Sequence, residues 1–292
     1  MHLRRRQLYT IIFIEAVLIG VVSLTLFFHM IKPQSPLGMA TTPTLSNGSE
    51  TPTGNVTAVP SQSTTPSSLK PAKVLNLTNW KITLPIGSDE KPTEVKQPVL
   101  TTYELNPWFV SIDNGKAVRF RAPVSSVTTS GSNYPRSELR EMTNNGTQQA
   151  SWSSSTGIHT MTVDQAITAV PTTKKHVVAG QIHDADDDVI VIRLEYPKLY
   201  VNVDGDNVVT LEENYQLGKR FTVKFVAQNG QTKVYYNGNT TPAYTLTKDY
   251  IGAYFKAGAY TQSNCNREGQ TSLCNDNNYG EVVIYDVDVT HR

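Results

Sequence analysis

The chain has 292 residues, of which 38% are hydrophobic and 17% are charged, and its formal net charge is +1. This length accommodates one large domain or two of ordinary size. The near-neutral balance argues against general nucleic-acid binding, so any attraction for an acidic ligand must be local.

The N-terminus is predicted to lie outside the folded domain. A basic flank over residues 1–9 precedes an apolar run over 10–31, in which Glu15 is the only formally charged residue. About 20 apolar residues suffice to cross a bilayer as a helix, and the basic flank would stay cytoplasmic. A cleaved signal peptide is the alternative, because Gly38-Met39-Ala40 resembles a cleavage site. Both alternatives place the domain outside the cytoplasm, secreted or on the cell surface.

Residues 32–72 are rich in Pro, Ser and Thr and nearly lack large apolar side chains. Such a segment cannot bury enough surface to offset its ordering entropy, so we predict a linker. N-glycosylation sequons occur in the linker and in the domain, and they begin at Asn47, Asn55, Asn76, Asn145 and Asn239. A chain rich in Asn and Thr produces some sequons by chance, but the pattern is that of a glycoprotein.

Residues 73–292 are predicted to form one domain of short alternating segments separated by turn signals. Dipeptides such as Asp204-Gly205 and Asn237-Gly238 favour hairpin turns, and no segment shows a sustained helical period. The predicted fold is therefore all-β, an antiparallel β-sandwich or jelly roll. The predicted strands are 117–123, 134–141, 157–167, 177–183, 189–196, 198–205, 220–228, 232–238, 253–260 and 280–289.

Three predicted strands carry polar side chains on one face and apolar side chains on the other, because strand side chains alternate. Taken singly, each set has an ordinary explanation as amphipathic surface or as a ladder of ion pairs. The combination of cations, an amide, an imidazole and a phenol, without a nearby nucleophile, favours a functional surface. The sets are Arg136, Glu138 and Arg140; Gln181 and His183; and Tyr254, Lys256 and Tyr260. In the segment 177–183, Val178 and Ile182 are predicted to share the opposite, apolar face.

This combination suits removal of a proton α to a carboxylate, followed by loss of a β-leaving group. Arg and Gln can neutralise the carboxylate and stabilise the enolate-like charge that develops. An imidazole can take the proton and a phenol can supply one. A uronic acid within a polysaccharide offers this arrangement, with the C5 proton beside the carboxylate and the glycosidic oxygen on C4.

The chain resembles the alginate lyases of polysaccharide lyase family 7. The family blocks R-S/T-E-L-R, Q-I/V-H and Y-F-K-A-G-x-Y-N-Q correspond to residues 136–140, 181–183 and 254–262, and LTNWKITLPIG (77–87) resembles the first strand region of the family. Thr261 stands where the family usually has Asn, which puts fine specificity in question. The resemblance covers essentially all of 73–292 and implies a β-jelly roll with an open concave cleft for alginate.

The resemblance also implies roles for individual residues. Arg136 and Gln181 would neutralise the uronate carboxylate, His183 would take the C5 proton, and Tyr260 would protonate the leaving oxygen. With mannuronate, Tyr260 can serve as both base and acid, and Ile182 between Gln181 and His183 favours guluronate-containing blocks. The cleft would be lined by Arg140, Lys256, Tyr254 and Gln262, with Glu138 bracing the two arginines.

The two cysteines, Cys265 and Cys274, are predicted to form one disulfide, because the domain meets an oxidising compartment. We expect no cofactor and no metal site, although the acidic run 184–188 leaves a calcium-binding loop open. The expected partner is an acidic polysaccharide, alginate. We expect a monomer that binds no nucleic acid and touches a membrane only through residues 10–31.

Three other functions remain open. A retaining glycoside hydrolase needs two carboxylates about 5–5.5 Å apart, commonly on a strand written E-x-D-x-x-E, and the chain lacks that string. A non-catalytic cell-surface carbohydrate-binding jelly roll would not need both His183 and Tyr260. A lyase acting on another polyuronate, such as glucuronan, would use the same chemistry.

Overall fold

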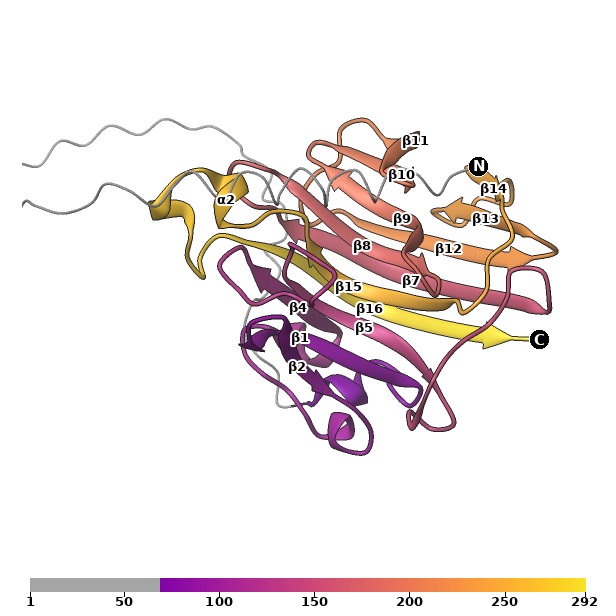
Figure 1. Cartoon of the computed structure of the whole chain (residues 1–292), viewed down its shortest axis with the longest axis horizontal. Coiled ribbons are helices and arrows are strands. Elements are labelled where there is room, and N and C mark those ends of the chain that lie inside the picture. Colours follow the sequence, from indigo (N-terminus) through magenta and orange to yellow (C-terminus); the bar gives the residue numbers. More distant parts are fainter. Residues whose placement is uncertain (1–68) are drawn as a thin grey trace, which may run out of the picture. The chain divides into compact units, whose positions relative to one another are not determined.

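The computed structural model describes residues 69–292, which form two antiparallel β-sheets packed face to face (Figure 1). The predicted sandwich is confirmed. The predicted membrane or signal segment 10–31 and most of the linker 32–72 lie outside the described residues. Between residues 69 and 292, no helix is long and apolar enough to cross a bilayer.

The front sheet carries the polar motifs. Its strands are β1 (Trp80–Ser88), β2 (Lys91–Val95), β5 (Arg136–Thr143), β6 (Gln148–Gln149), β8 (His176–His183), β9 (Asp188–Glu195), β10 (Lys198–Val203), β11 (Asp206–Glu212) and β15 (Tyr254–Thr261). Their order is β11-β10-β9-β8-β15-β5-β1-β2, with β6 paired to β5. Strands from distant parts of the chain therefore become neighbours.

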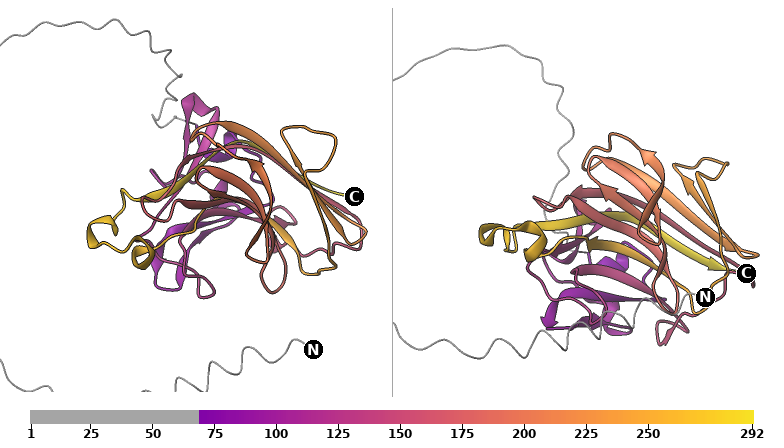
Figure 2. Two further views of the ribbon diagram at one scale, coloured as in Figure 1. Left: turned by 90° about the horizontal axis from the view of Figure 1, so that it is seen from above. Right: turned by 45° about the horizontal axis from the view of Figure 1, so that its top comes forward.

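The back sheet is built of seven strands in the order β14-β13-β12-β7-β16-β4-β3. These are β3 (Phe109–Ile112), β4 (Ala117–Pro123), β7 (Ile158–Ala169), β12 (Arg220–Gln228), β13 (Gln231–Tyr236), β14 (Tyr244–Thr247) and β16 (Tyr279–His291). The strands twist and curve (Figure 2), as β-strands of L-residues do. The described helices are one short helix, α2 (Cys265–Glu268), and 3-10 turns at Pro71–Lys73, Val99–Thr101, Asp113–Gly115 and Thr271–Leu273.

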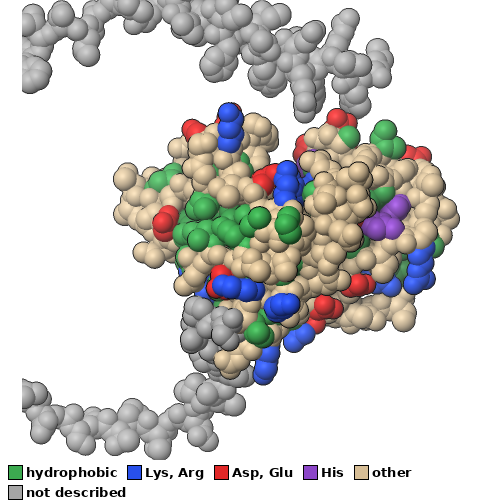
Figure 3. Space-filling model, turned by 90° about the horizontal axis from the view of Figure 1, so that it is seen from below, with side chains coloured by type: hydrophobic (Ala, Val, Ile, Leu, Met, Phe, Trp, Pro, Cys, Tyr) green, Lys and Arg blue, Asp and Glu red, His purple; other side chains and the backbone are tan. Residues whose placement is uncertain are grey.

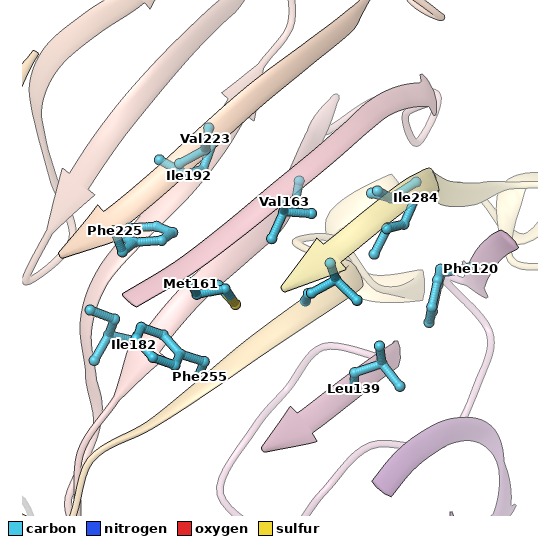
Figure 4. Close-up of a cluster of buried hydrophobic side chains, with 14 of the residues drawn as sticks. Phe120, Leu139, Met161, Val163, Ile182, Ile192, Val223, Phe225, Phe255 and Ile284 are labelled. Carbon is cyan, nitrogen blue, oxygen red and sulfur yellow. The ribbon is translucent and has the colours of Figure 1, made fainter. Parts of the chain in front are cut away.

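The apolar sides of the two sheets meet in a contiguous core (Figure 4). Leu139 of β5, Ile182 of β8 and Phe255 of β15 are fully buried there, and they are sequence neighbours of the polar residues on the opposite face. Full burial of such side chains stabilises the fold by about 1.5–3 kcal/mol each. The core thus orients the polar face, because a side chain cannot enter the core without sending its neighbour outward.

Most predicted strands are confirmed, and those at 117–123 and 220–228 match residue for residue. The sequence pattern missed β2, β3, β6, β11 and β14. β2 and β11 are edge strands with half-exposed residues, so they show little hydrophobic alternation. The folded part also begins slightly before residue 73, because Pro71 is buried.

One prediction about strand faces is wrong. Strict alternation places Val178 on the same face as Ile182, in the core. The pairing of β8 with β9 shifts between Val178 and Gly180, and Val178 lines a surface hollow together with Gln181. A β-bulge inserts one extra residue and so reverses the alternation beyond it.

Candidate active site

Strand β15 lies between β8 and β5, and this order brings the three polar motifs together. The motifs are far apart in the sequence, yet their residues face one another across neighbouring strands. Residues directly opposite on antiparallel strands have Cβ atoms about 4.5–5.5 Å apart. The opposed pairs are Tyr254–His183, Lys256–Gln181, Lys256–Arg140 and Tyr260–Arg136.

Glu138 is the centre of the site. Its side chain is fully buried, and its Oε2 accepts from Lys256 Nζ at 2.7 Å and from Arg136 Nη1 at 3.2 Å. Gln181 Nε2 donates to the other oxygen, Oε1, at 2.6 Å. One carboxylate therefore holds two cations and an amide side by side. Glu138 thus pairs with Arg136, as expected, but its second cation is Lys256 rather than Arg140.

Burial and neighbouring charges together shift the pKa values of Glu138 and Lys256. Burial would raise the pKa of Glu138, but Lys256 and Arg136 outweigh that effect and hold it below its usual range. Burial, together with the Arg136 guanidinium, lowers the pKa of Lys256 to about 8, although Glu138 opposes the shift. At neutral pH the cluster therefore carries one negative and two positive charges.

His183 has one ring nitrogen engaged. Its Nδ1 lies 2.8 Å from the Asp184 carbonyl oxygen, so Nδ1 carries the hydrogen and Nε2 is the unprotonated atom of the neutral ring. Burial lowers the pKa of His183, and Lys256 adds to this, against the effect of the hydrogen bond to Asp184. The ring also stacks on Tyr254, with centroids 5.1 Å apart. His183 is thus a neutral, oriented imidazole at pH 7.

Tyr260 lies on the other side of the cluster. The Arg136 guanidinium carbon lies 3.9 Å from the centre of the Tyr260 ring. The Tyr260 hydroxyl forms a hydrogen bond with Ser132 Oγ at 2.8 Å. The guanidinium and the Ser132 hydroxyl therefore hold the Tyr260 ring and its hydroxyl in one orientation beside the cluster.

Two hollows lie along this face, separated by the Glu138 cluster. The first measures about 520 Å³ and contains His183, Arg136, Arg140, Tyr254 and Lys256 among its lining residues. The second measures about 440 Å³ and includes Gln181, Tyr260 and Gln262. Every predicted catalytic or binding residue except the buried Glu138 therefore borders one of two adjacent hollows, which suits a chain-like ligand.

Charge at the surface is mixed. Seen from below, Lys and Arg side chains alternate with acidic side chains rather than forming one broad basic field (Figure 3). This agrees with the formal net charge of +1. At the first hollow, by contrast, the three cations Arg136, Arg140 and Lys256 lie together.

Comparison with known proteins identifies the fold and the motifs. The model of a family described as alginate lyase matches residues 75–291. The chain belongs to this family. By sequence and fold it is a polysaccharide lyase of the alginate lyase type.

Individual relatives agree with this assignment. The solved structure of the alginate lyase AlgAT5 from polysaccharide lyase family 7 is 52% identical, with a TM-score of 0.72 over 77% of this chain and 100% of that one. An alginate lyase from Corynebacterium sp. is 48% identical, with a TM-score of 0.73 over 76% of this chain and 98% of the other. An alginate lyase of Klebsiella pneumoniae is 31% identical over 169 residues, 49% of this chain. The match spans 53% of that curated relative.

Arg140 has more than one function in this lyase. Its guanidinium carbon lies 3.9 Å from the centre of the Tyr254 ring, and Nη1 donates to the Glu141 carbonyl at 2.7 Å. Nη2 donates to Gln149 Oε1 at 3.0 Å. Arg140 thus lines the cleft and also connects β5 to β6.

Thr261, which departs from the family pattern, points away from the cleft. It is fully buried, and its Oγ1 donates to the Ala122 carbonyl in the back sheet at 2.7 Å. Its side chain therefore contacts the other sheet rather than a bound polymer. Gly258, in the same strand, has φ +136°, and a Cβ there would lie 2.6 Å from the Ser137 carbonyl oxygen, so only glycine fits between Glu138 and the core.

The predicted disulfide between Cys265 and Cys274 is present. In the acidic run 184–188, Asp184 Oδ1 accepts from the backbone N–H groups of Asp186 and Asp187, and the described residues contain no cluster of three His, Cys, Asp or Glu side chains arranged to hold a metal.

Sequence patterns missed several residues that border the cleft. Lys81 and Glu94 form an ion pair in the first hollow, and Tyr134 and Arg193 line the second. Lys174 Nζ donates to the Tyr134 hydroxyl at 2.9 Å. These residues lie on other strands and in loops, so no local alternation connects them to the three motifs.

Proposed function

We propose that this protein cleaves alginate by β-elimination and prefers guluronate-containing blocks. The observation that carries the proposal is the Glu138 cluster, which presents Arg136 and Gln181 on one face of the sheet, with His183 and Tyr260 on either side. A hydrolase would need a second carboxylate at the reacting centre, whereas the acidic side chain at this centre is engaged by three partners.

In this mechanism Arg136 and Gln181 bind the uronate carboxylate. Each uses one donor on Glu138 and retains others for the substrate, because a guanidinium has five N–H groups and an amide has two. Their positive charge and dipole stabilise the carboxylate as it becomes enolate-like. Lys256 and Arg140 attract neighbouring uronates of the polymer.

His183 Nε2 then removes the C5 proton. The electron pair of the C5–H bond forms the C4=C5 double bond, and the C4–O bond breaks. Tyr260 gives its proton to the departing oxygen, and His183 keeps the proton from C5. With mannuronate, in which C5 has the opposite configuration, Tyr260 serves as both base and acid. The preference for guluronate is supported by Ile182 in the Q-I-H block.

The test is incubation of the purified protein with polyguluronate, polymannuronate and glucuronan. Elimination creates a double bond conjugated to the carboxylate, so ultraviolet absorbance rises, fastest with polyguluronate. New reducing ends without absorbance would show hydrolysis, and binding without cleavage would show a carbohydrate-binding module. Faster cleavage of polymannuronate or glucuronan would overturn the proposed substrate preference.

The residue roles are tested with His183→Ala and Tyr260→Phe on polyguluronate. Loss of a general acid or base lowers kcat about 10²- to 10⁴-fold, and we expect losses of that size with unchanged thermal unfolding. Near-normal turnover by either folded variant would refute the role assigned to that residue.

A further inference from the structure

We infer that Ser132 is a positioning residue for Tyr260, which rests on the proposed role of Tyr260 as general acid. Ser132 lies in the loop that leads into β5, 128 residues from Tyr260 in the sequence. Its Oγ lies 2.8 Å from the Tyr260 hydroxyl oxygen, and either oxygen can donate. Among residues 69–292, Ser132 is the hydrogen-bond partner of that phenol.

The Ser132 hydroxyl has two acceptors for its single hydrogen. The Tyr134 N–H donates to Ser132 Oγ at 3.0 Å and fixes its position. The hydrogen of Ser132 can go to the Tyr134 carbonyl oxygen at 3.2 Å or to the Tyr260 oxygen at 2.8 Å. The hydroxyl can therefore either accept from Tyr260 or donate to it without moving its oxygen.

The two orientations of the Ser132 hydrogen fit the two states of Tyr260, before and after it gives up its proton. While Tyr260 holds its proton, the phenol can donate to Ser132, and Ser132 donates to the Tyr134 carbonyl. When the proton passes from Tyr260 to the leaving oxygen, a negative charge develops on the phenol oxygen. Rotation of the Ser132 hydroxyl then supplies a hydrogen bond to that charge. The atoms balance, because Ser132 keeps its own hydrogen throughout.

Two hydrogen bonds hold the loop in place directly after Ser132. The Asn133 carbonyl accepts from Asn264 Nδ2 at 2.9 Å, and the Tyr134 hydroxyl accepts from Lys174 Nζ at 2.9 Å. Asn264 is itself fixed, since its Oδ1 caps α2 by accepting from the Arg267 N–H. Asn264, which directly precedes the disulfide-closed loop, thus helps to keep Ser132 within reach of Tyr260.

A hydrogen bond to a charged oxygen is stronger than one to a neutral hydroxyl. The contact with Ser132 therefore stabilises the transition state more than the bound substrate, and such an interaction raises kcat without changing KM. The Arg136 guanidinium over the ring acts in the same direction. We expect Ser132→Ala to lower kcat on polyguluronate about 10- to 100-fold, the range for loss of a charge-assisted hydrogen bond.

Two variants control for loop structure. Ser132→Thr keeps the hydroxyl and should retain most of kcat. Asn133→Ala removes an exposed side chain from the same loop and leaves its carbonyl bonded to Asn264, so its kcat should equal that of the native protein. Loss of activity in Asn133→Ala equal to that in Ser132→Ala would assign the effect to loop disruption and overturn the role of Ser132.

A substrate with an activated leaving group separates positioning of the acid from a general structural effect. A guluronate carrying a nitrophenyl ether at C4 releases a stable phenolate and does not need a proton from Tyr260. The defect of Ser132→Ala should shrink to within about threefold of the native rate on this substrate, since acid catalysis no longer contributes. An undiminished defect would show that Ser132 acts on another step.

Tyr260→Phe is measured in parallel to keep the two ideas apart. If Tyr260→Phe is inactive on the polymer and Ser132→Ala has native kcat, the role of Ser132 is wrong and the proposed function stands. If Tyr260→Phe is active on polyguluronate, the acid assignment itself is wrong, and the role of Ser132 fails with it.

Discussion

Two buried glutamates on β5 illustrate how one strand serves two purposes. Glu138 and Glu141 are 1% and 2% exposed, and because they are three residues apart they lie on opposite faces of the strand. Glu138 accepts from Lys256, Arg136 and Gln181 at the cleft. Glu141 accepts from Trp152 Nε1 at 3.1 Å and from the Phe255 N–H at 2.9 Å.

The partners of Glu141 extend into a pair of histidines. His291 Nε2 lies 2.6 Å from Glu141 Oε1, and His291 Nδ1 lies 2.6 Å from His159 Nδ1. His159 Nε2 lies 2.8 Å from the Thr156 carbonyl. The two imidazoles therefore connect Glu141 to the backbone carbonyl of Thr156.

The difference lies in the partners rather than in the carboxylates. Glu138 holds two cations side by side at the cleft, where the proposed mechanism requires positive charge for the uronate carboxylate. Glu141 connects β5, β15 and β16 and borders a separate hollow of about 400 Å³ that contains none of the three motifs' cleft-facing side chains. A buried carboxylate is thus a functional marker only when its partners also face a ligand.

The largest expected effect comes from removing each charge in turn. Glu138→Gln leaves Lys256 and Arg136 without their counter-charge, and loss of one partner of a buried pair lowers the free energy of unfolding by about 3–5 kcal/mol. Glu141→Gln keeps acceptors for Trp152 and Phe255 and should lose about 1–3 kcal/mol. Denaturant unfolding measures both values, and ultraviolet assays should show a large loss of kcat/KM only for Glu138→Gln. Equal losses of activity would remove the distinction between the two glutamates.

A second expected effect concerns pH and the cleft. Because the pKa of Lys256 is lowered to about 8, its ammonium loses the proton above that pH and the cleft loses one positive charge. KM for polyguluronate should rise as pH passes from 7 to 9 in the native protein. In Lys256→Met, KM should be high already and should not show that rise. A parallel rise in both proteins would assign the titration to another group.

A third expected effect separates the histidine pair from the cleft. Burial, with the charge of His291, lowers the pKa of His159. The unfolded chain then binds more protons than the folded chain below the ordinary pKa of about 6.5, so the free energy of unfolding falls as pH drops through that range. The melting temperature of His159→Phe should therefore fall less between pH 7.5 and 5.5 than that of the native protein. An equal fall in both would exclude His159 as the source.

The smallest expected effect concerns an amide that belongs to neither glutamate. Gln165 of β7 is fully buried, and within residues 69–292 neither its Oε1 nor its Nε2 has a hydrogen-bond partner. An unsatisfied buried amide destabilises a fold, so Gln165→Met should raise the free energy of unfolding by about 1 kcal/mol. Gln181→Met is the matched control, since Gln181 donates to Glu138 and its loss should destabilise the protein and lower activity. A destabilised Gln165→Met would show that the amide is satisfied in solution.

Local sequence patterns determined most strand positions and the direction of many cleft side chains. Alternation of apolar and polar side chains identified most strands, because a strand with one buried face must repeat every two residues. The same alternation placed Arg136, Glu138 and Arg140 on one face, and the three family blocks carried further cleft residues. Neither pattern identified Lys81, Glu94, Tyr134 or Arg193. Edge strands such as β2 and β11 were missed because their residues are half exposed and carry no such pattern.

Only the tertiary structure decided which residues meet. The order β8-β15-β5 makes neighbours of strands from distant parts of the chain, and no local pattern encodes that order. This order places Lys256 beside Glu138. Packing of the two sheets places His291 beside Glu141, and the loop before β5 places Ser132 beside Tyr260. A bulge between Val178 and Gly180 also turned Val178 of β8 from the predicted core face to the cleft face. The physical reason is that strand alternation fixes the direction of each side chain, whereas sheet pairing and burial choose its partners.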